Sequence, residues 1–214
     1  MKLIQSTKNP ELKQLRLLFE KARERKKKKL FVIEGEREIK KAILSDYSFT
    51  QVFMEDGSAP VEPEVQTLAL HTPAFRVERK AFERISKRSG SEKIMAVAQI
   101  KSHELGDLTL TDQALVLVIE APEKPGNIGA LFRTAAAAKM DAVIIANPKT
   151  DFYNPNSIRS SLGSIFLLPS ALAPSSEVIS YLNTKSFAIV AAAIEPNAIP
   201  YDHYKYNTPC ALVL

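Results

Sequence analysis

The sequence has few residues of the kinds that mark unusual protein classes. Its 214 residues include one cysteine, no tryptophan and only seven glycines. A single cysteine, Cys210, cannot form an internal disulfide, so we expect a reducing, cytoplasmic environment. The shortage of glycine excludes a collagen-like chain, which needs glycine at every third position. A hydrophobic content of 45% excludes a fully disordered one.

Long apolar segments are also missing. The longest uncharged apolar run, FAIVAAAI at 187–194, is far shorter than the roughly 20 residues that a membrane span requires. The N-terminal sequence MKLIQSTKNP lacks the apolar centre of a secretory signal peptide. We therefore expect neither a membrane span nor a secretion signal.

Basic side chains are in excess, and the excess is confined to one half of the chain. The sequence has 29 Lys and Arg against 24 Asp and Glu, and residues 1–113 hold 22 of the former and 17 of the latter. Two runs of basic residues carry much of this charge, namely Arg23, Arg25 and Lys26 to Lys29, and then Arg76, Arg79, Lys80, Arg84, Lys87 and Arg88. Runs of this kind are usually solvated faces, although they also suit contact with nucleic acid phosphates.

Helical and strand patterns alternate along the sequence. Residues 10–22 carry apolar side chains at helical spacing, with Asn9 placed as N-cap and Pro10 at the first helical position. The like charges at 23–29 are expected to fray this helix. Strands are expected at 30–34, 51–55, 94–100, 114–121, 141–147, 187–194 and 209–214, and further helices at 35–44, 62–70, 80–88, 126–140 and 175–186.

This alternation predicts an α/β protein of two domains. Residues 1–100 form a small α/β domain, residues 101–113 a polar linker, and residues 114–214 a domain with a parallel sheet of continuously apolar strands. The final segment, PCALVL, has the pattern of a central strand. Since a parallel strand is normally followed by a crossover, we expect a chain truncated at Leu214; a short edge strand that closes the sheet is the alternative.

The densest cluster of chemically informative residues is EKPGNIGALFRTAAAA, at 123–138. Gly126 and Gly129 flank Asn127 at a strand-to-helix turn, where glycine lets backbone approach a ligand and free N–H groups favour an anion. Arg133 follows within two helical turns, so Asn127 and Arg133 can flank one phosphate–ribose unit. The alternative is that Asn127 merely caps the helix and Arg133 is solvated. The spacing lacks the glycine pattern of nicotinamide dinucleotide sites.

A second cluster is DFYNPNSIRSSLGSIFLLP, at 151–169. Its Asn154-Pro155 pair favours a turn. The following residues predict a compact polar surface that leads into an apolar strand, with a capped short helix as the alternative. The polar and turn-forming members of this surface are Ser157, Arg159, Ser160, Ser161 and Gly163.

The three histidines are isolated in the sequence. His71, His103 and His203 have no cysteine or carboxylate at the spacing of metal ligands, so we expect no metal and histidines in surface or loop positions.

Together the two clusters resemble the SpoU (TrmH-like) family of RNA ribose 2′-O-methyltransferases, in the SPOUT class. The family's first motif, Asn-x-Gly-x-x-x-Arg followed by small residues, matches residues 127–135, and its second, Asn/Asp-Pro-x-x-x-Arg-x-Ser-x-Gly, matches residues 154–163. The first half is similar to the family's ribosomal-protein-like substrate-binding domain, with Glu34-Gly35 after its first strand and the strand MAVA at 95–98.

The resemblance implies methyl transfer from S-adenosylmethionine to a ribose 2′-hydroxyl of ribosomal or transfer RNA. It gives Arg133 the role of activating that hydroxyl and Asn127 the role of holding the ribose or its phosphate. Ala192 and Ala193 would belong to the cofactor pocket. The residues expected to bind substrate RNA are Lys26, Lys27, Lys28, Lys29, Arg84, Lys87, Arg88, Arg159 and Ser161.

The resemblance also implies a homodimer formed through the second domain. In the family, a strand like ALVL continues into a Gly-x-Glu-x-x-Gly loop, a Ser-Leu-Asn turn and a last helix, which tie the α/β knot. This sequence stops before these segments, so we expect an incomplete cofactor site and a chain that is inactive alone. The alternative function is a non-catalytic RNA-binding protein that keeps the fold.

Overall fold

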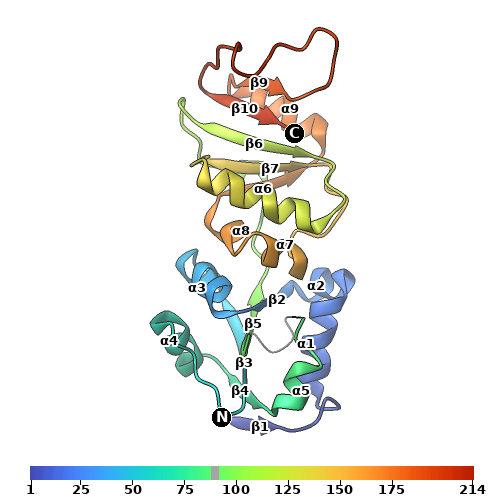
Figure 1. The fold of residues 1–214 in the computed structure, drawn as a ribbon, viewed down its shortest axis with the longest axis vertical. Coiled ribbons are helices and arrows are strands. Elements are labelled where there is room, and N and C mark those ends of the chain that lie inside the picture. Colours follow the sequence, from blue (N-terminus) through green and yellow to red (C-terminus); the bar gives the residue numbers. More distant parts are fainter. Residues whose placement is uncertain (88–91) are drawn as a thin grey trace.

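The apolar strands in the first half of the chain pair into a mixed five-stranded sheet (Figure 1). The computed structural model describes residues 1–87 and 92–214. Within the first sheet, β5 runs antiparallel to both of its neighbours, while the other two pairings are parallel. The strands, in spatial order, are β1 (Lys2–Ile4), β4 (Ala74–Val77), β3 (Phe49–Glu55), β5 (Ile94–Gln99) and β2 (Leu30–Glu34).

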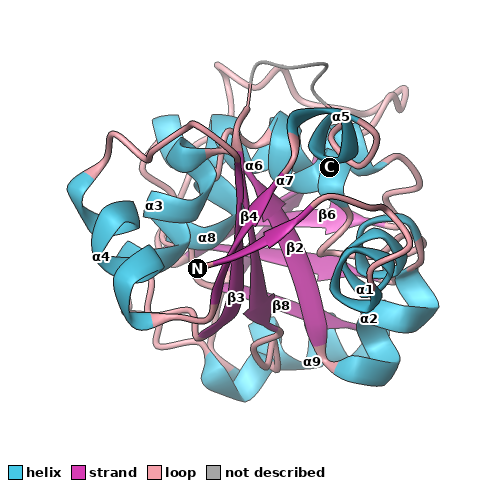
Figure 2. Cartoon of the chain, turned by 90° about the horizontal axis from the view of Figure 1, so that it is seen from below, coloured by secondary structure: helices cyan, strands magenta, loops and turns pink. Residues whose placement is uncertain are grey.

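Helices cover both faces of this sheet, because successive side chains of a strand point to opposite faces. Val32 and Phe53 pack against α1 (Pro10–Glu20) and α5 (Arg79–Glu83), whereas Ile33 and Val52 face α3 (Glu36–Leu44) and α4 (Pro63–His71). Figure 2 shows α1 and the α3–α4 pair on opposite sides of the strands. The predicted cap is confirmed, since the Asn9 side chain accepts a backbone hydrogen bond of 2.8 Å in the first turn of α1.

The basic run at 23–29 is a helix and not a frayed end. Lys21 adopts an extended conformation after α1, and α2 (Ala22–Lys28) begins directly behind it. The Arg25 side chain is buried, and its guanidinium donates hydrogen bonds to the carbonyls of Leu18 and Phe19. These internal partners anchor α2 against the repulsion among its exposed neighbours, so the expectation of fraying is wrong.

The second half forms a five-stranded sheet in which every pairing is parallel. The chain starts at the centre of this sheet with β6, moves outward through β7 and β8, and then crosses to the other side for β9 and β10. β10 has a neighbour on each side, so it is a central strand and not an edge strand. In spatial order the strands are β8 (Ser170–Ala173), β7 (Ala142–Ala146), β6 (Leu115–Glu120), β10 (Cys210–Val213) and β9 (Ala188–Ala191).

Successive side chains of the central strand β6 again point to opposite faces of the sheet, and a layer of helices covers each face. Leu117 and Ile119 of β6 lie in the core beneath α6 (Pro125–Ala137), whereas Val116 and Val118 face α9 (Ser175–Thr184). The expected strand after residue 163 is wrong. Two short helices, α7 (Pro155–Ser160) and α8 (Ser164–Leu167), occupy this segment, and β8 starts only afterwards.

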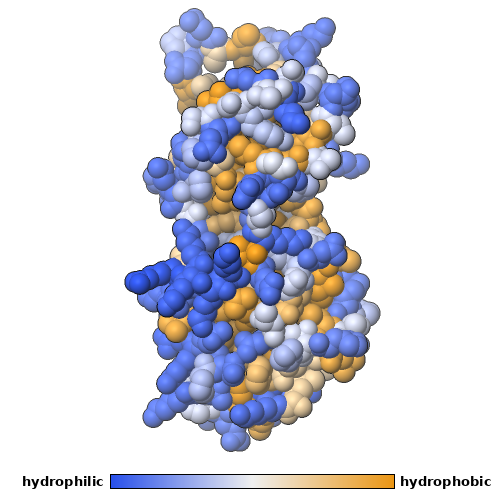
Figure 3. All heavy atoms as spheres, turned by 180° about the vertical axis from the view of Figure 1, so that it is seen from behind, coloured by the Kyte–Doolittle hydropathy of each residue, from blue (hydrophilic) through white to orange (hydrophobic). Residues whose placement is uncertain are grey.

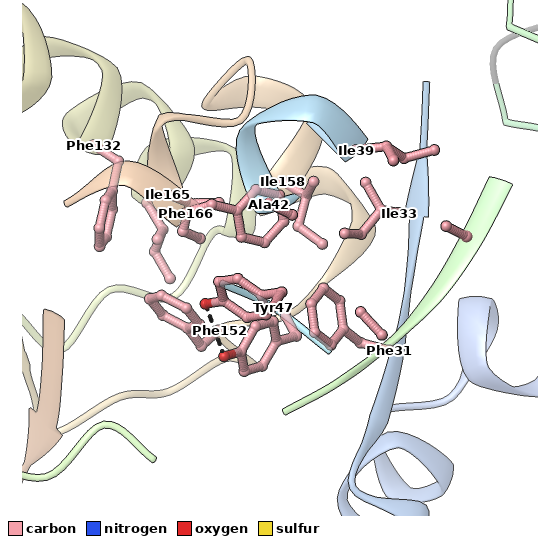
Figure 4. Packing of buried hydrophobic residues seen from close by; sticks show 14 of the residues in the cluster. Phe31, Ile33, Ile39, Ala42, Tyr47, Phe132, Phe152, Ile158, Ile165 and Phe166 are labelled. Atoms are coloured by element: carbon pink, nitrogen blue, oxygen red, sulfur yellow. Dashed lines mark hydrogen bonds between the residues drawn. The ribbon is translucent and has the colours of Figure 1, made fainter. Parts of the chain in front are cut away.

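The two halves share one apolar core (Figure 4). Phe31 and Tyr47 of the first half contact Phe166 and Tyr153 of the second, with ring centroids 4.1 to 6.3 Å apart. Burying an aromatic side chain of this size stabilises a structure by about 1.5–3 kcal/mol. Several such contacts therefore hold the first half firmly against the second half.

The segment at 101–113 connects β5 to β6 and contains a short 3₁₀ helix (Leu105–Asp107). Leu108 is buried against the second sheet, and the Leu172 N–H donates to the His103 carbonyl. Within residues 1–87 and 92–214, no helix has the length and apolar character needed to cross a bilayer. The same residues contain no cluster of three or more His, Cys, Asp and Glu side chains suited to a metal ion.

Candidate functional site

The first candidate site lies on α6, which leaves the carboxyl end of β6. Lys124 occupies the N-cap position and Pro125 follows it, so Asn127 is the third residue of the helix and does not cap it. The side chains of Asn127 and Arg133 are both exposed. Neither makes a hydrogen bond to another residue that the structure describes, so both are free to contact a ligand.

Gly129 has a different role from the one its motif suggests. It is buried where α6 crosses α7, and a Cβ atom at this position would lie 2.4 Å from the Ser157 carbonyl oxygen and 2.6 Å from the Ser161 nitrogen. The absent side chain thus permits backbone-to-backbone contact between two helices, and not the approach of a ligand. This contact fixes the two sequence motifs to each other.

The second motif divides into an exposed and a buried part. Asn154 caps α7 by accepting a hydrogen bond of 2.9 Å from the Asn156 N–H, and Arg159 is exposed at the end of the helix. Ser161 is fully buried, with its hydroxyl bonded to the Ile158 carbonyl and to the Gly163 N–H. The expected RNA contact of Ser161 is therefore wrong, because its hydroxyl holds the turn and does not reach the surface.

A polar cluster that the motifs do not indicate stands at the carboxyl edge of the second sheet. Asn147 donates to Glu120 at 3.0 Å and to the Ser175 hydroxyl at 2.7 Å, and that hydroxyl donates to the other Glu120 oxygen at 2.5 Å. Glu120 ends β6, whereas Asn147 and Ser175 follow β7 and β8. The sequence gives no partner for Glu120, and only the parallel strand order brings the three side chains together.

The largest cavity near the expected cofactor residues has a volume of about 570 Å³ and lies between β9, β10 and the loop that joins them. Ala192 and Ala193 form part of its wall, as does Glu195. This volume is typical of a small-molecule site. Tyrosine faces suit a flat base or a sulfonium cation, and a carboxylate suits a positive charge. The tyrosines that line it are Tyr201, Tyr204 and Tyr206.

The S-adenosylmethionine that the resemblance implies is thus compatible with the residues of this cavity. No residue of α6 lines it, however. Within one chain the structure does not bring Asn127 and Arg133 to Ala192 and Ala193.

Most of the expected RNA contacts are accessible. Lys26, Lys27, Lys28 and Lys29 are exposed on and directly after α2, and Figure 3 shows hydrophilic side chains gathered on this side of the molecule. Arg84 is also exposed, whereas Arg88 lies outside the described residues. Arg25, in the same run, is buried and cannot contact RNA.

The two halves of the chain each contribute a basic side chain to one narrow recess. Lys87 of the first half and Arg159 of the second line it, together with Glu34 and Asn156. Both basic side chains are exposed, so positive charge continues from the first half of the chain onto the second.

His103 lies in the loop after β5, as expected, but its ring is partly buried and hydrogen-bonded. Its Nε2 lies 2.7 Å from the Tyr153 hydroxyl and its Nδ1 lies 3.1 Å from the Ser170 carbonyl. The same hydroxyl lies 3.2 Å from that of Tyr47, shown by the dashed line in Figure 4, and accepts from the Lys101 N–H. Burial lowers the pKa of His103 and raises that of Tyr153.

Comparison with protein families divides the chain into two parts. Residues 114–214 match the SpoU rRNA Methylase family, and residues 9–96 match the MRM3-like substrate binding domain.

Individual relatives match the whole chain. The 23S rRNA (guanosine(2553)-2′-O)-methyltransferase RlmP of Bacillus subtilis is 27% identical over 214 residues, which is all of this chain and 82% of the relative. A crystal structure of an RNA 2′-O ribose methyltransferase is 31% identical, with a TM-score of 0.83 over 99% of this chain and 81% of that one. The AdoMet-bound rRNA methyltransferase of Sinorhizobium meliloti, 22% identical, shares the fold with a TM-score of 0.87 over 99% and 80%.

Proposed function

Because the chain belongs to the SpoU family of RNA 2′-O-methyltransferases, we propose that it transfers a methyl group from S-adenosylmethionine to a ribose 2′-hydroxyl of ribosomal RNA. The observation that carries this proposal is the exposed pair of Asn127 and Arg133 on α6. Both side chains lack partners among the described residues, and the helix that presents them is fixed against α7 through Gly129.

The reaction develops negative charge on the ribose 2′-oxygen as it loses its proton. Arg133 cannot take this proton, because its guanidinium stays protonated in proteins. It instead stabilises the developing alkoxide, and a substrate phosphate can accept the proton. Asn127 holds the ribose or the neighbouring phosphate through its amide. Most of the acceleration then comes from orientation and electrostatic stabilisation.

The cofactor supplies an electrophilic methyl group on a sulfonium centre. In this chain the residues that would hold it line the cavity beside β9. The rings of Tyr201 and Tyr206 suit the base, Glu195 suits the positive charge, and the backbone at Ala192 and Ala193 forms the wall.

Substrate RNA would bind along the exposed basic side chains of both halves. Lys26 to Lys29 and Arg84 offer contacts on the first half, and Lys87 and Arg159 continue them across the boundary. Contacts of this kind bind the phosphate backbone without reading sequence. The target nucleotide would be selected by the shape of the ribosomal RNA. Such a substrate, together with the single buried thiol, favours a cytoplasmic location.

A homodimer formed through the second domain is part of the proposal. Arg133 lies on α6 and no residue of that helix lines the cavity, so a second copy can supply one half of each site. Mixing Arg133→Ala with Glu195→Ala tests this arrangement, since each variant should be inactive alone and the mixture should regain part of the activity. Absence of recovery, with sedimentation at the mass of a monomer, would refute it.

The central experiment is methyl transfer to ribosomal RNA from cells that lack the gene, by the full-length product of that gene, because residues 1–214 are expected to be inactive alone. Labelled S-adenosylmethionine should deliver one 2′-O-methyl group at one site, and Arg133→Ala should not. If the full-length product binds RNA but neither binds the cofactor nor transfers methyl groups, the alternative of a non-catalytic RNA-binding protein is correct.

A further inference from the structure

One buried arginine of the first half reaches the second motif of the other half. The Arg25 Nε lies 2.6 Å from the Asp151 Oδ2 atom, and the two side chains are 2% and 11% exposed. Its Nη1 atom donates to the carbonyls of Leu18, at 2.7 Å, and Phe19, at 3.2 Å. Arg25 thus binds the last turn of α1 and Asp151 at the same time.

Asp151 in turn sets the start of the segment that contains the second motif. Its other carboxylate oxygen, Oδ1, accepts from the Tyr153 N–H at 3.3 Å, and its carbonyl accepts from the Asn154 N–H at 3.0 Å. Asn154 caps α7, which carries Arg159 in its last turn. The position of Arg159 therefore depends on a turn that Arg25 holds from the other domain.

The same segment supports the helix of the first motif. Gly129 of α6 lies in backbone contact with Ser157 and Ser161 of the α7 region. A displacement of α7 would therefore move α6, and with it Arg133. Close-packed backbone leaves no room to absorb such a displacement locally.

Lysine cannot replace arginine at position 25. The planar guanidinium reaches a carboxylate and two carbonyls with fixed donors, whereas an ammonium is a single point of charge on a flexible stem. Removing one partner of a buried ion pair also leaves the other charged and uncompensated. The remaining basic residues of α2, including its neighbour Lys26, are exposed.

We propose that Arg25 is a positioning residue for methyl transfer, which fixes the 151–163 segment and, through Gly129, the helix that presents Arg133. α2 then has two functions on its two sides, because its outer lysines face RNA while its inner arginine holds the active half. This inference rests on the proposed function only where methyl transfer is the readout.

The experiment uses Arg25→Lys and Asp151→Asn in the full chain, with Arg16→Met as the matched control. Arg16 also pairs with a carboxylate, Glu20, at 2.9 Å, but the pair is exposed and lies within α1. Amide hydrogen exchange should accelerate at least tenfold at 151–163 and in α6 of both variants, while β3 and β5 exchange as in the unchanged chain. Arg16→Met should leave all of these rates unaltered.

Methyl transfer provides the second readout. Arg25→Lys and Asp151→Asn should each lower kcat at least tenfold. RNA affinity should fall less than kcat, because Arg159 is the only proposed RNA contact on the displaced segment. Unchanged exchange at 151–163, or equally faster exchange in both sheets, would overturn the positioning role. If the full-length product without substitutions methylates no ribosomal RNA, the proposed function fails, and the exchange experiment still decides the role of Arg25. Should Arg25→Lys not fold, Asp151→Asn, which keeps the size of the side chain, gives the same test.

Discussion

Gly129 of α6 and Ser157 of α7 are in direct backbone contact, since a Cβ atom on Gly129 would lie 2.4 Å from the Ser157 carbonyl oxygen. This contact joins the two halves of a bipartite motif. The sequence motif suggests that Gly129 lets the backbone approach a ligand, but the contact shows that this glycine allows two helices to pack.

Gly129→Ala should destabilise the protein by about 1–3 kcal/mol, because the backbone atoms opposite cannot move aside without separating two helices. Gly126→Ala is the matched control. Its Cβ would meet only the Ser160 hydroxyl at 3.8 Å, and alanine is the better helix former. Urea unfolding of both variants gives the measurement. Equal stability of the two would contradict the packing role.

Arg133→Ala should abolish methyl transfer and leave the unfolding midpoint unchanged, since the side chain is exposed and makes no internal bond among the described residues. Loss of one donor to a developing oxyanion typically costs about 10²–10³ in kcat. Lys185→Ala, an exposed change on the same domain, should retain full activity. Activity in Arg133→Ala within tenfold of the unchanged chain would exclude the catalytic role.

Reversal of charge at Lys26 to Lys29 should weaken binding of ribosomal RNA and flatten its dependence on salt. Each lost phosphate contact lowers the slope of log affinity against log salt by about 0.7–0.9. Cofactor affinity should not change, because no residue of α2 lines the cavity beside β9. Binding titrations at several salt concentrations test this. An unaltered slope would show that these lysines are merely solvated.

Tyr153→Phe should cost about 1–3 kcal/mol of stability, because it leaves His103 and the Lys101 N–H without their partner in a mostly buried position. Tyr47→Phe removes a single hydrogen bond and should cost about 0.5–1.5 kcal/mol. Denaturant unfolding of the two variants compares them directly. A Tyr47→Phe protein less stable than Tyr153→Phe would refute this network.

Stability should fall as the pH drops below about 6.5. Burial lowers the pKa of His103 from its ordinary value of 6.5, and the effect of nearby Lys101 has the same sign, while the Ser170 carbonyl and Asp107 oppose it. As the pH falls, His103 therefore binds its proton in the unfolded chain before it does so in the folded one. The free energy of unfolding decreases until the pH is below the lower pKa of His103 in the folded state.

The contribution of His103 to this pH dependence can be measured by comparing a substitution of His103 with a substitution of His71. His103→Gln should reduce the loss of stability between pH 7.5 and 5.5, whereas a change at the exposed His71 should not. Unfolding midpoints at the two pH values give the comparison. Equal pH dependence in His103→Gln and the unchanged chain would contradict the assignment.

The strands and long helices follow from local patterns in the sequence. Alternating and continuous apolar runs predict β2, β3, β5 and most of the second sheet, and the Asn9-Pro10 pair predicts the start of α1. These elements could be predicted because each pattern involves only residues that are close together in the sequence. β1 and β4 are too short to show a pattern, and their pairing depends on residues distant in the sequence.

The candidate site could be predicted only in part. The exposed Asn127 and Arg133 follow from the motif, but the burial of Ser161 depends on how α7 meets α6. Arg25 is indistinguishable by charge from its neighbours. Its position does continue the inward spacing of α1 through Leu18 and Ala22, and this periodicity is the one signal that could have identified it.

The place of β10 in the second sheet has a consequence for how the protein is made. β10 lies between β6 and β9, although its residues, 210–213, are the last of the sheet to be synthesised. Until they leave the ribosome, β6 and β9 expose unpaired edges, which invite pairing with other chains. The first sheet needs nothing beyond Gln99. The substrate-binding half can therefore fold early, while the catalytic half depends on its final strand and is the half that chaperones would need to protect.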